Sequence, residues 1–108
     1  MAYEITTEEL KTKITNNEDY LLIDVLSPES YEARHVPTAV NIPNGPELVK
    51  KVDEMNIPKD REIIAYCTSA TCGTSPAAAQ ALEKAGYTNV AHYKDGLAGW
   101  QDAGYDFE

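Results

Sequence analysis

Short apolar runs alternate along this chain with segments whose apolar residues recur at helical spacing. The apolar runs are residues 20–25, 39–42 and 63–66, of which the first is almost unbroken, and residues 89–93 alternate well enough for a further short strand. Such a run is typical of a strand that is covered on both faces of a parallel sheet. Helices are expected after residue 6 and over residues 29–34, 47–54, 77–85 and 95–101. The alternation predicts an α/β fold with three layers, a mainly parallel five-stranded sheet flanked by helices, formed by residues 1–108 as a single domain.

Local signals mark where some of these helices begin and end. Thr6 and Glu9 have the spacing of a capping box, in which each residue's side chain bonds the other's backbone N–H. Ser75 precedes Pro76, and this pair predicts that Ser75 is the N-cap of the helix that follows the third apolar run. Gly86 is expected to end that helix in a left-handed conformation.

The charge of the chain is strongly acidic. It carries 18 acidic and 9 basic side chains, a net charge of −9, with no cluster of basic residues. We therefore expect neither a nucleic acid nor an anionic membrane as a partner. No apolar run approaches the roughly 20 residues of a membrane span, and the start of the chain does not resemble a signal peptide. These features predict a cytoplasmic protein, which we expect to be a monomer.

Cys67 is the strongest candidate for chemistry. It directly follows the third apolar run and precedes a segment of small residues, after which a helix begins. A thiol at the end of a strand and over the N-terminus of a helix is favoured as a thiolate, because the unpaired N–H groups and the helix dipole stabilise negative charge. We therefore predict that Cys67 is a nucleophile whose pKa lies below the ordinary value of about 8.5.

Other uses of the cysteines are less well supported. Cys67, Cys72, His35 and His92 could together bind a metal ion, but four residues separate the cysteines and no second close pair is present. A thioredoxin-like redox pair has two intervening residues rather than four. A phosphatase of the protein tyrosine phosphatase type has an arginine after five intervening residues, where this chain has Gly73. We expect no metal and no organic cofactor.

Three motifs in order resemble rhodanese domains. The first runs from Asp24 through the segment 35–43, which contains a His-Val-Pro turn; the second is the strand, loop and helix around Cys67; the third contains Gly96 and Trp100. The resemblance covers nearly the whole chain. It implies a rhodanese-type sulfurtransferase or sulfane-sulfur carrier in which Cys67 forms a persulfide.

The resemblance also implies roles for other residues. The loop after Cys67 would bind the substrate. Asp24 and His35 lie outside this loop, so we expect them to support the scaffold. The donor would be a small sulfur compound or a persulfide protein, and the acceptor a thiol, a protein or cyanide. The expected loop residues are Thr68, Ser69, Ala70, Thr71, Cys72 and Gly73.

The chain departs from the family pattern at several positions. Leu26 stands where many members have arginine, while Arg34 and Thr38 replace glycines. The loop from Cys67 to Cys72 contains no Arg or Lys, so backbone N–H groups should dominate binding and thiosulfate should be a poorer donor than a persulfide of lower charge. Two alternatives stay open. In the first alternative, the domain is a non-catalytic binding or regulatory module. In the second, Cys67 and Cys72 form a thiol redox switch in which Cys72 is the resolving thiol.

Overall fold

The sheet of this protein has five parallel strands. The computed structural model describes residues 3–69 and 73–108. In this part of the chain the strands pair in the order β1-β5-β4-β2-β3, and each pair is parallel. The predicted α/β fold with a five-stranded sheet is therefore confirmed. The strands are β1 (Tyr3–Ile5), β2 (Tyr20–Asp24), β3 (Val40–Asn41), β4 (Glu62–Tyr66) and β5 (Val90–Tyr93).

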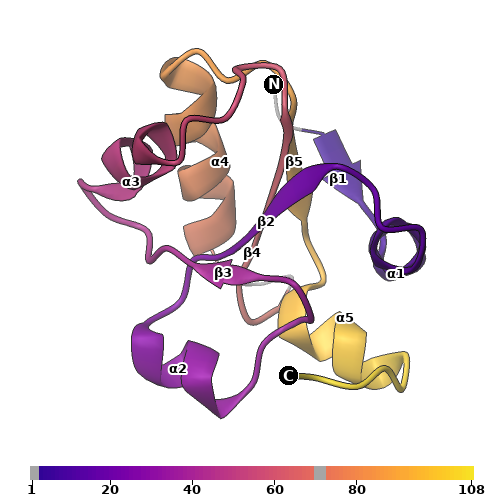
Figure 1. Cartoon of the computed structure of the whole chain (residues 1–108). Helices are drawn as coiled ribbons and strands as arrows, with labels where there is room; N and C mark the ends of the chain where they lie inside the picture. Colours follow the sequence, from indigo (N-terminus) through magenta and orange to yellow (C-terminus); the bar gives the residue numbers. More distant parts are fainter. Residues whose placement is uncertain (1–2, 70–72) are drawn as a thin grey trace.

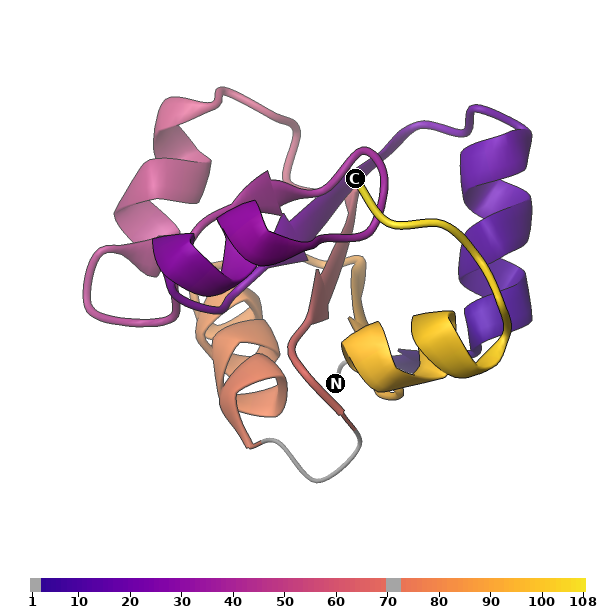
Figure 2. The same ribbon diagram turned by 90° about the horizontal axis from the view of Figure 1, so that it is seen from below.

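Helices cover both faces of the sheet, as Figures 1 and 2 show. The helices are α1 (Thr7–Thr15), α2 (Pro28–Ala33), α3 (Leu48–Glu54), α4 (Thr74–Lys84) and α5 (Gly96–Asp102). In Figure 2, α3 and α4 lie on one side of the strands, and α1 and α5 lie on the other. Helix α2 lies at the lower end of the sheet in Figure 1, where the parallel strands end.

Two apolar cores hold the three layers together. Alternate residues of the central strands face opposite helices, so Ile63 and Ala65 pack toward α4 while Ile64 and Tyr66 pack toward α5. All four of these side chains are fully buried, as is Trp100 on α5. Burial on both faces explains why the second and fourth strands are nearly continuous apolar runs in the sequence.

Strand β1 was not located by the sequence pattern. It has three residues, of which Tyr3 and Glu4 are exposed and only Ile5 is buried. It pairs with β5 alone, at the edge of the sheet. Such a short, half-exposed edge strand has too few apolar residues to show an alternation.

The helix signals were correct at two places and wrong at one. Thr6 and Glu9 form the predicted capping box, and Gly86 has a φ of 101°. Ser75 is not the N-cap of α4, because the helix begins at Thr74 and Gly73 occupies the cap position. A proline fits any position of the first helical turn, since those N–H groups have no intrahelical partner. The Ser-Pro pair therefore placed the helix start slightly too late.

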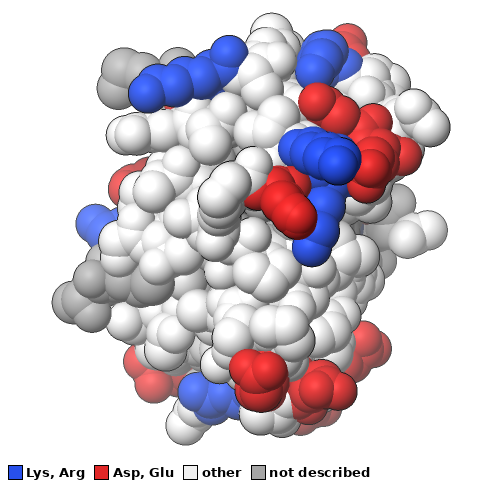
Figure 3. Space-filling view, turned by 90° about the vertical axis from the view of Figure 1, so that its left-hand side faces the viewer, with Lys and Arg blue, Asp and Glu red and all other residues white. Residues whose placement is uncertain are grey.

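The surface seen in Figure 3, on the side of α3, has charged side chains of both signs over its upper half and along its lower edge, with a largely uncharged area between them. Among the described residues, no helix has the length and apolar character needed to cross a membrane.

Candidate active site

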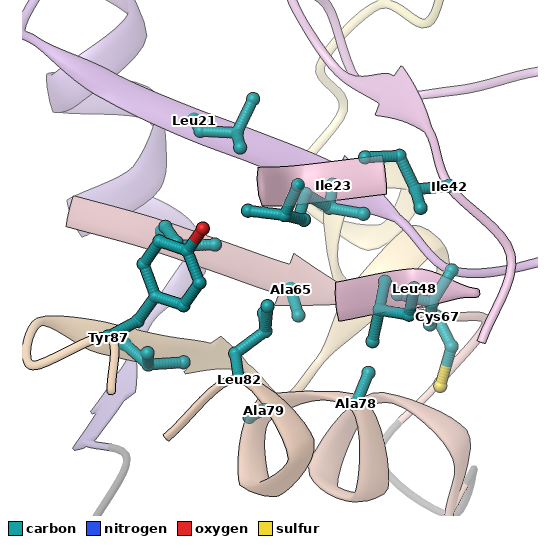
Figure 4. Close-up of a cluster of buried hydrophobic side chains, with 14 residues drawn as sticks. Leu21, Ile23, Ile42, Leu48, Ala65, Cys67, Ala78, Ala79, Leu82 and Tyr87 are labelled. Atoms are coloured by element: carbon teal, nitrogen blue, oxygen red, sulfur yellow. The ribbon is translucent and has the colours of Figure 1, made fainter. Parts of the chain in front are cut away.

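Cys67 lies at the carboxyl end of the central strand β4. The residue follows Tyr66 directly and is 1% exposed. Figure 4 shows its sulfur pointing from the strand toward α4, beside Ala78. The structure describes Cys67 in a disulfide-bonded form, so a thiolate at this position exists only after reduction.

The backbone around Cys67 is held by the start of α5. The Leu97 N–H donates to the Cys67 carbonyl oxygen at 3.1 Å, and the Ala98 N–H donates to the Thr68 carbonyl oxygen at 2.9 Å. Gly96 makes this approach possible. Its φ is +61°, and a Cβ at this position would lie 2.3 Å from the Cys67 carbonyl oxygen. The glycine of the third motif is thus a close-packing residue beneath the candidate nucleophile.

Ser75 and His92 connect to the sulfur of Cys67. The Ser75 hydroxyl oxygen lies 3.4 Å from Cys67 Sγ and 2.7 Å from His92 Nε2. Ser75 is 1% exposed and His92 is half-buried. Burial lowers the pKa of His92; nearby Lys94 also lowers it, whereas Glu4 opposes the shift. The imidazole is therefore neutral at pH 7, and Nε2 can accept or donate a hydrogen bond depending on its tautomer.

The contact between Ser75 and His92 was not predicted from the sequence. Ser75 was expected only as a helix cap, and His92 only as a possible metal ligand. The two residues are 17 positions apart on different elements, so no local spacing relates them. The β4–β5 register, in which Ala65 pairs with His92, places the imidazole near the end of β4 that carries Cys67.

The predicted substrate loop is only partly described. Thr68 and Gly73 are exposed, and Ser69 is half-buried. The predictions for Ala70, Thr71 and Cys72 fall outside the described residues.

Asp24 lies in a buried hydrogen-bond network that joins β2, β4 and the turn after α2. Its carboxylate accepts hydrogen bonds from the Leu26 N–H and the Tyr66 hydroxyl, each at 2.9 Å. The Tyr66 hydroxyl in turn accepts from the Val36 N–H at 3.0 Å. Burial raises the pKa of Asp24, while the hydrogen bonds from Leu26 and Tyr66 act against that shift. These contacts fix the chain path at the end of β2.

His35 contacts the scaffold rather than the sulfur. Its Nδ1 lies 2.9 Å from the Tyr31 carbonyl oxygen, and the two rings stack with centroids 3.8 Å apart. Its backbone exchanges two hydrogen bonds with Glu108. His35 therefore joins α2 to the carboxyl end of the chain.

A pocket of about 230 Å³ borders Thr68, the residue after Cys67. Apolar side chains form much of its wall, and Arg34 supplies a positive charge. The Arg34 guanidinium lies 5.0 Å from the centre of the Phe107 ring and donates to the Gln101 side-chain oxygen. Among the described residues it forms no ion pair with a carboxylate, so its charge can attract an anion. The pocket is lined by Leu26, Ser30, Ala33, Arg34, Thr68 and Leu97.

A second pocket, of about 590 Å³, borders Ser69 and is acidic. Ser69 lines it together with Glu8, Asp95 and Asp102. These carboxylates would repel an anion, whereas Arg34 would attract one to the pocket beside Thr68. Within the described part of the chain, no three His, Cys, Asp or Glu side chains come close enough to bind a metal ion.

Comparison with known proteins identifies relatives over nearly all of the chain. The family model for the rhodanese-like domain matches residues 6–103. A sulfurtransferase of Allochromatium vinosum is 31% identical over 100 residues, which cover 93% of this chain and 89% of that protein. The thiosulfate sulfurtransferase structure from Pseudomonas aeruginosa has a TM-score of 0.87 and 26% identity, covering 99% of this chain and 20% of that one.

One relative has a regulatory name. The HTH-type transcriptional regulator Rv0324 of Mycobacterium tuberculosis is 40% identical over 83 residues, which cover 77% of this chain. The chain spans only 35% of the length of that regulator.

Proposed function

Because the chain belongs to the rhodanese-like domain family, we propose that it is a sulfurtransferase or sulfur carrier that loads a sulfane sulfur on Cys67. The observation that carries the proposal is the position of the Cys67 sulfur, at the end of the central strand and in contact with a hydroxyl of the first turn of α4. This environment supplies a hydrogen-bond donor and the positive end of a helix dipole, both of which favour a thiolate.

The reaction has two transfer steps. The reduced Cys67 thiolate attacks the outer sulfur of a donor persulfide, the donor S–S bond breaks, and its electron pair leaves with the inner sulfur as a thiolate. A new S–S bond now joins Cys67 to the transferred sulfur. An acceptor thiolate then attacks that outer sulfur and releases the Cys67 thiolate. Electrons and atoms balance without a metal or an organic cofactor.

The Arg34 pocket suggests which donors the site prefers. Its apolar wall and single positive charge fit a small persulfide with a carboxylate, since a guanidinium binds a carboxylate through two charge-assisted hydrogen bonds. Thiosulfate carries two negative charges, so the acidic side chains of the pocket beside Ser69 would repel it more strongly than a donor with one negative charge. We therefore expect a carboxylate-bearing persulfide to be a better donor than thiosulfate.

Intact mass measurement tests the proposal. The protein is first reduced and freed of reductant, then incubated with a small persulfide or with thiosulfate. We expect wild type and Cys72→Ser to gain the mass of one sulfur atom and Cys67→Ser to gain none. The two variants make the same chemical change at different cysteines, so a gain on Cys67→Ser, or no gain on wild type with either donor, would refute a carrier role for Cys67.

A regulatory module is the second candidate function, and the resemblance to the Rv0324 regulator favours it. In that case Cys67 would not pass sulfur to an acceptor, whether or not it takes sulfur up. Adding a thiol acceptor to the loaded protein separates the two functions, because only a transferase returns rapidly to the unloaded mass. The cytoplasmic location, the monomeric state and the role of Cys72 as a resolving thiol stay predictions; for Cys72, a shorter persulfide lifetime in wild type than in Cys72→Ser would support that role.

A further inference from the structure

We infer that Ser75 and His92 form a proton relay that ionises Cys67 for sulfur transfer, with Ser75 touching the reacting sulfur and His92 acting through Ser75. This inference rests on the proposed function and extends it to residues outside the cysteine loop. Neither residue was predicted from the sequence to take part in the chemistry.

The relay is continuous and largely removed from water. Cys67 Sγ, Ser75 Oγ and His92 Nε2 lie in sequence at 3.4 Å and 2.7 Å, within hydrogen-bond reach for sulfur and for oxygen with nitrogen respectively. Cys67 and Ser75 are each 1% exposed. A hydroxyl between a thiol and an imidazole can accept from one and donate to the other at the same time, since it has one proton and two lone pairs.

The proton movements balance. In the reduced resting state the Cys67 thiol donates to Ser75 Oγ, and the Ser75 hydroxyl donates to Nε2 of neutral His92. A shift of both protons leaves a thiolate that accepts from the Ser75 hydroxyl, and an imidazolium. After the Cys67 thiolate has taken the outer sulfur of the donor, the proton on His92 passes to the thiolate that leaves the donor. The cycle therefore gains and loses no protons.

The surroundings of His92 keep its imidazole neutral in the resting state. It lies on β5 between β1 and β4, with Glu4 of β1 paired opposite it and Lys94 two residues along. Burial is the main cause that lowers the pKa of His92, with Lys94 acting in the same direction and Glu4 against it. A histidine that is neutral at pH 7 has a free lone pair for the Ser75 proton.

The test measures how fast reduced Cys67 reacts with iodoacetamide across pH, in a Cys72→Ser background that leaves one cysteine. We expect Ser75→Ala and His92→Gln to slow the reaction about tenfold near pH 7. Ser75→Ala removes the hydroxyl that donates to the thiolate, and His92→Gln removes the base that takes up the proton through Ser75. At pH well above the thiol pKa, hydroxide ionises the thiol directly and all variants should react at the parent rate. Ser75→Thr keeps the hydroxyl and should restore the parent profile.

A purely structural role gives a different pattern. Loosened packing would change the rate at every pH, and Ser75→Thr would not restore it. If Ser75→Ala and His92→Gln keep the parent pH profile, the relay is wrong even when Cys67 takes up sulfur. If the parent takes up no sulfur from any donor, the proposed function fails while the alkylation profile still reports on the relay.

Discussion

Replacing Gly96 with alanine should damage the active site by pushing the Cys67 backbone away from α5. A Cβ at position 96 would lie 2.3 Å from the Cys67 carbonyl oxygen and 3.0 Å from the Thr68 carbonyl carbon. Both contacts are with backbone, so no side-chain rotation relieves them. The two hydrogen bonds from the start of α5, donated by Leu97 and Ala98, must lengthen or break.

The expected loss of stability follows from two contributions. The left-handed conformation of Gly96 costs a residue with a Cβ about 1 kcal/mol after the gain from a less flexible unfolded chain. Two lost hydrogen bonds contribute about 2 kcal/mol together. Gly96→Ala should therefore lower the free energy of unfolding by about 3 kcal/mol, a large part of the roughly 5–15 kcal/mol of a typical domain.

Gly104→Ala is the matched control for this change. Gly104 also has a positive φ, of +79°, but a Cβ there would meet nothing within 4 Å. Gly104→Ala should therefore lower the free energy of unfolding by only the conformational contribution of about 1 kcal/mol. Urea unfolding measures both variants, and sulfur uptake by the reduced protein measures the site. Equal losses for Gly96→Ala and Gly104→Ala would show that the approach of α5 to the Cys67 carbonyl is not tight.

Three further changes test other parts of the structure. Tyr66→Phe removes the hydroxyl that donates a hydrogen bond to the buried Asp24 carboxylate. Because one carboxylate oxygen then lacks this partner, the free energy of unfolding measured in urea should fall by about 2 kcal/mol. Arg34→Gln should raise KM for a carboxylate-bearing persulfide about tenfold with kcat unchanged. Arg61 precedes the amino end of β4, so Arg61→Gln should change neither constant. If wild type and Arg34→Gln have equal KM values in steady-state assays, Arg34 does not bind the donor. Thr38→Gly should raise the free energy of unfolding by up to about 1 kcal/mol, because Thr38 has a φ of 75° that glycine adopts without strain; a clear loss in urea unfolding would contradict this.

Thr38 illustrates what a family pattern predicts and what it leaves open. The resemblance indicated a glycine position, and the positive φ shows the backbone reason for one. The family pattern did not predict which contact the threonine side chain makes at this position. The Thr38 hydroxyl lies 2.9 Å from the Tyr20 hydroxyl, a contact that glycine could not make and that offsets part of the strain.

Local sequence patterns predicted most of the fold but not the contacts of the active site. The central strands and the capping box depend on residues that are close in the sequence, so their signals are readable there. The Arg34 pocket and the contact between Ser75 and His92 depend on which strands are neighbours and in what register. A one-dimensional pattern carries little of that information, and these features were missed.

The register of β4 and β5 therefore determines the active site as much as the cysteine loop does. Ala65 pairs with His92, so the imidazole and the Cys67 side chain both face α4, where Ser75 lies between them. A slip of one residue would turn His92 to the opposite face of the sheet, because side chains alternate along a strand. The same segment continues into α5, whose Gly96 and first N–H groups hold the Cys67 carbonyl. Residues 90–98 thus position both the backbone and the sulfur of Cys67, and changes in this segment should alter sulfur chemistry without touching the cysteine loop.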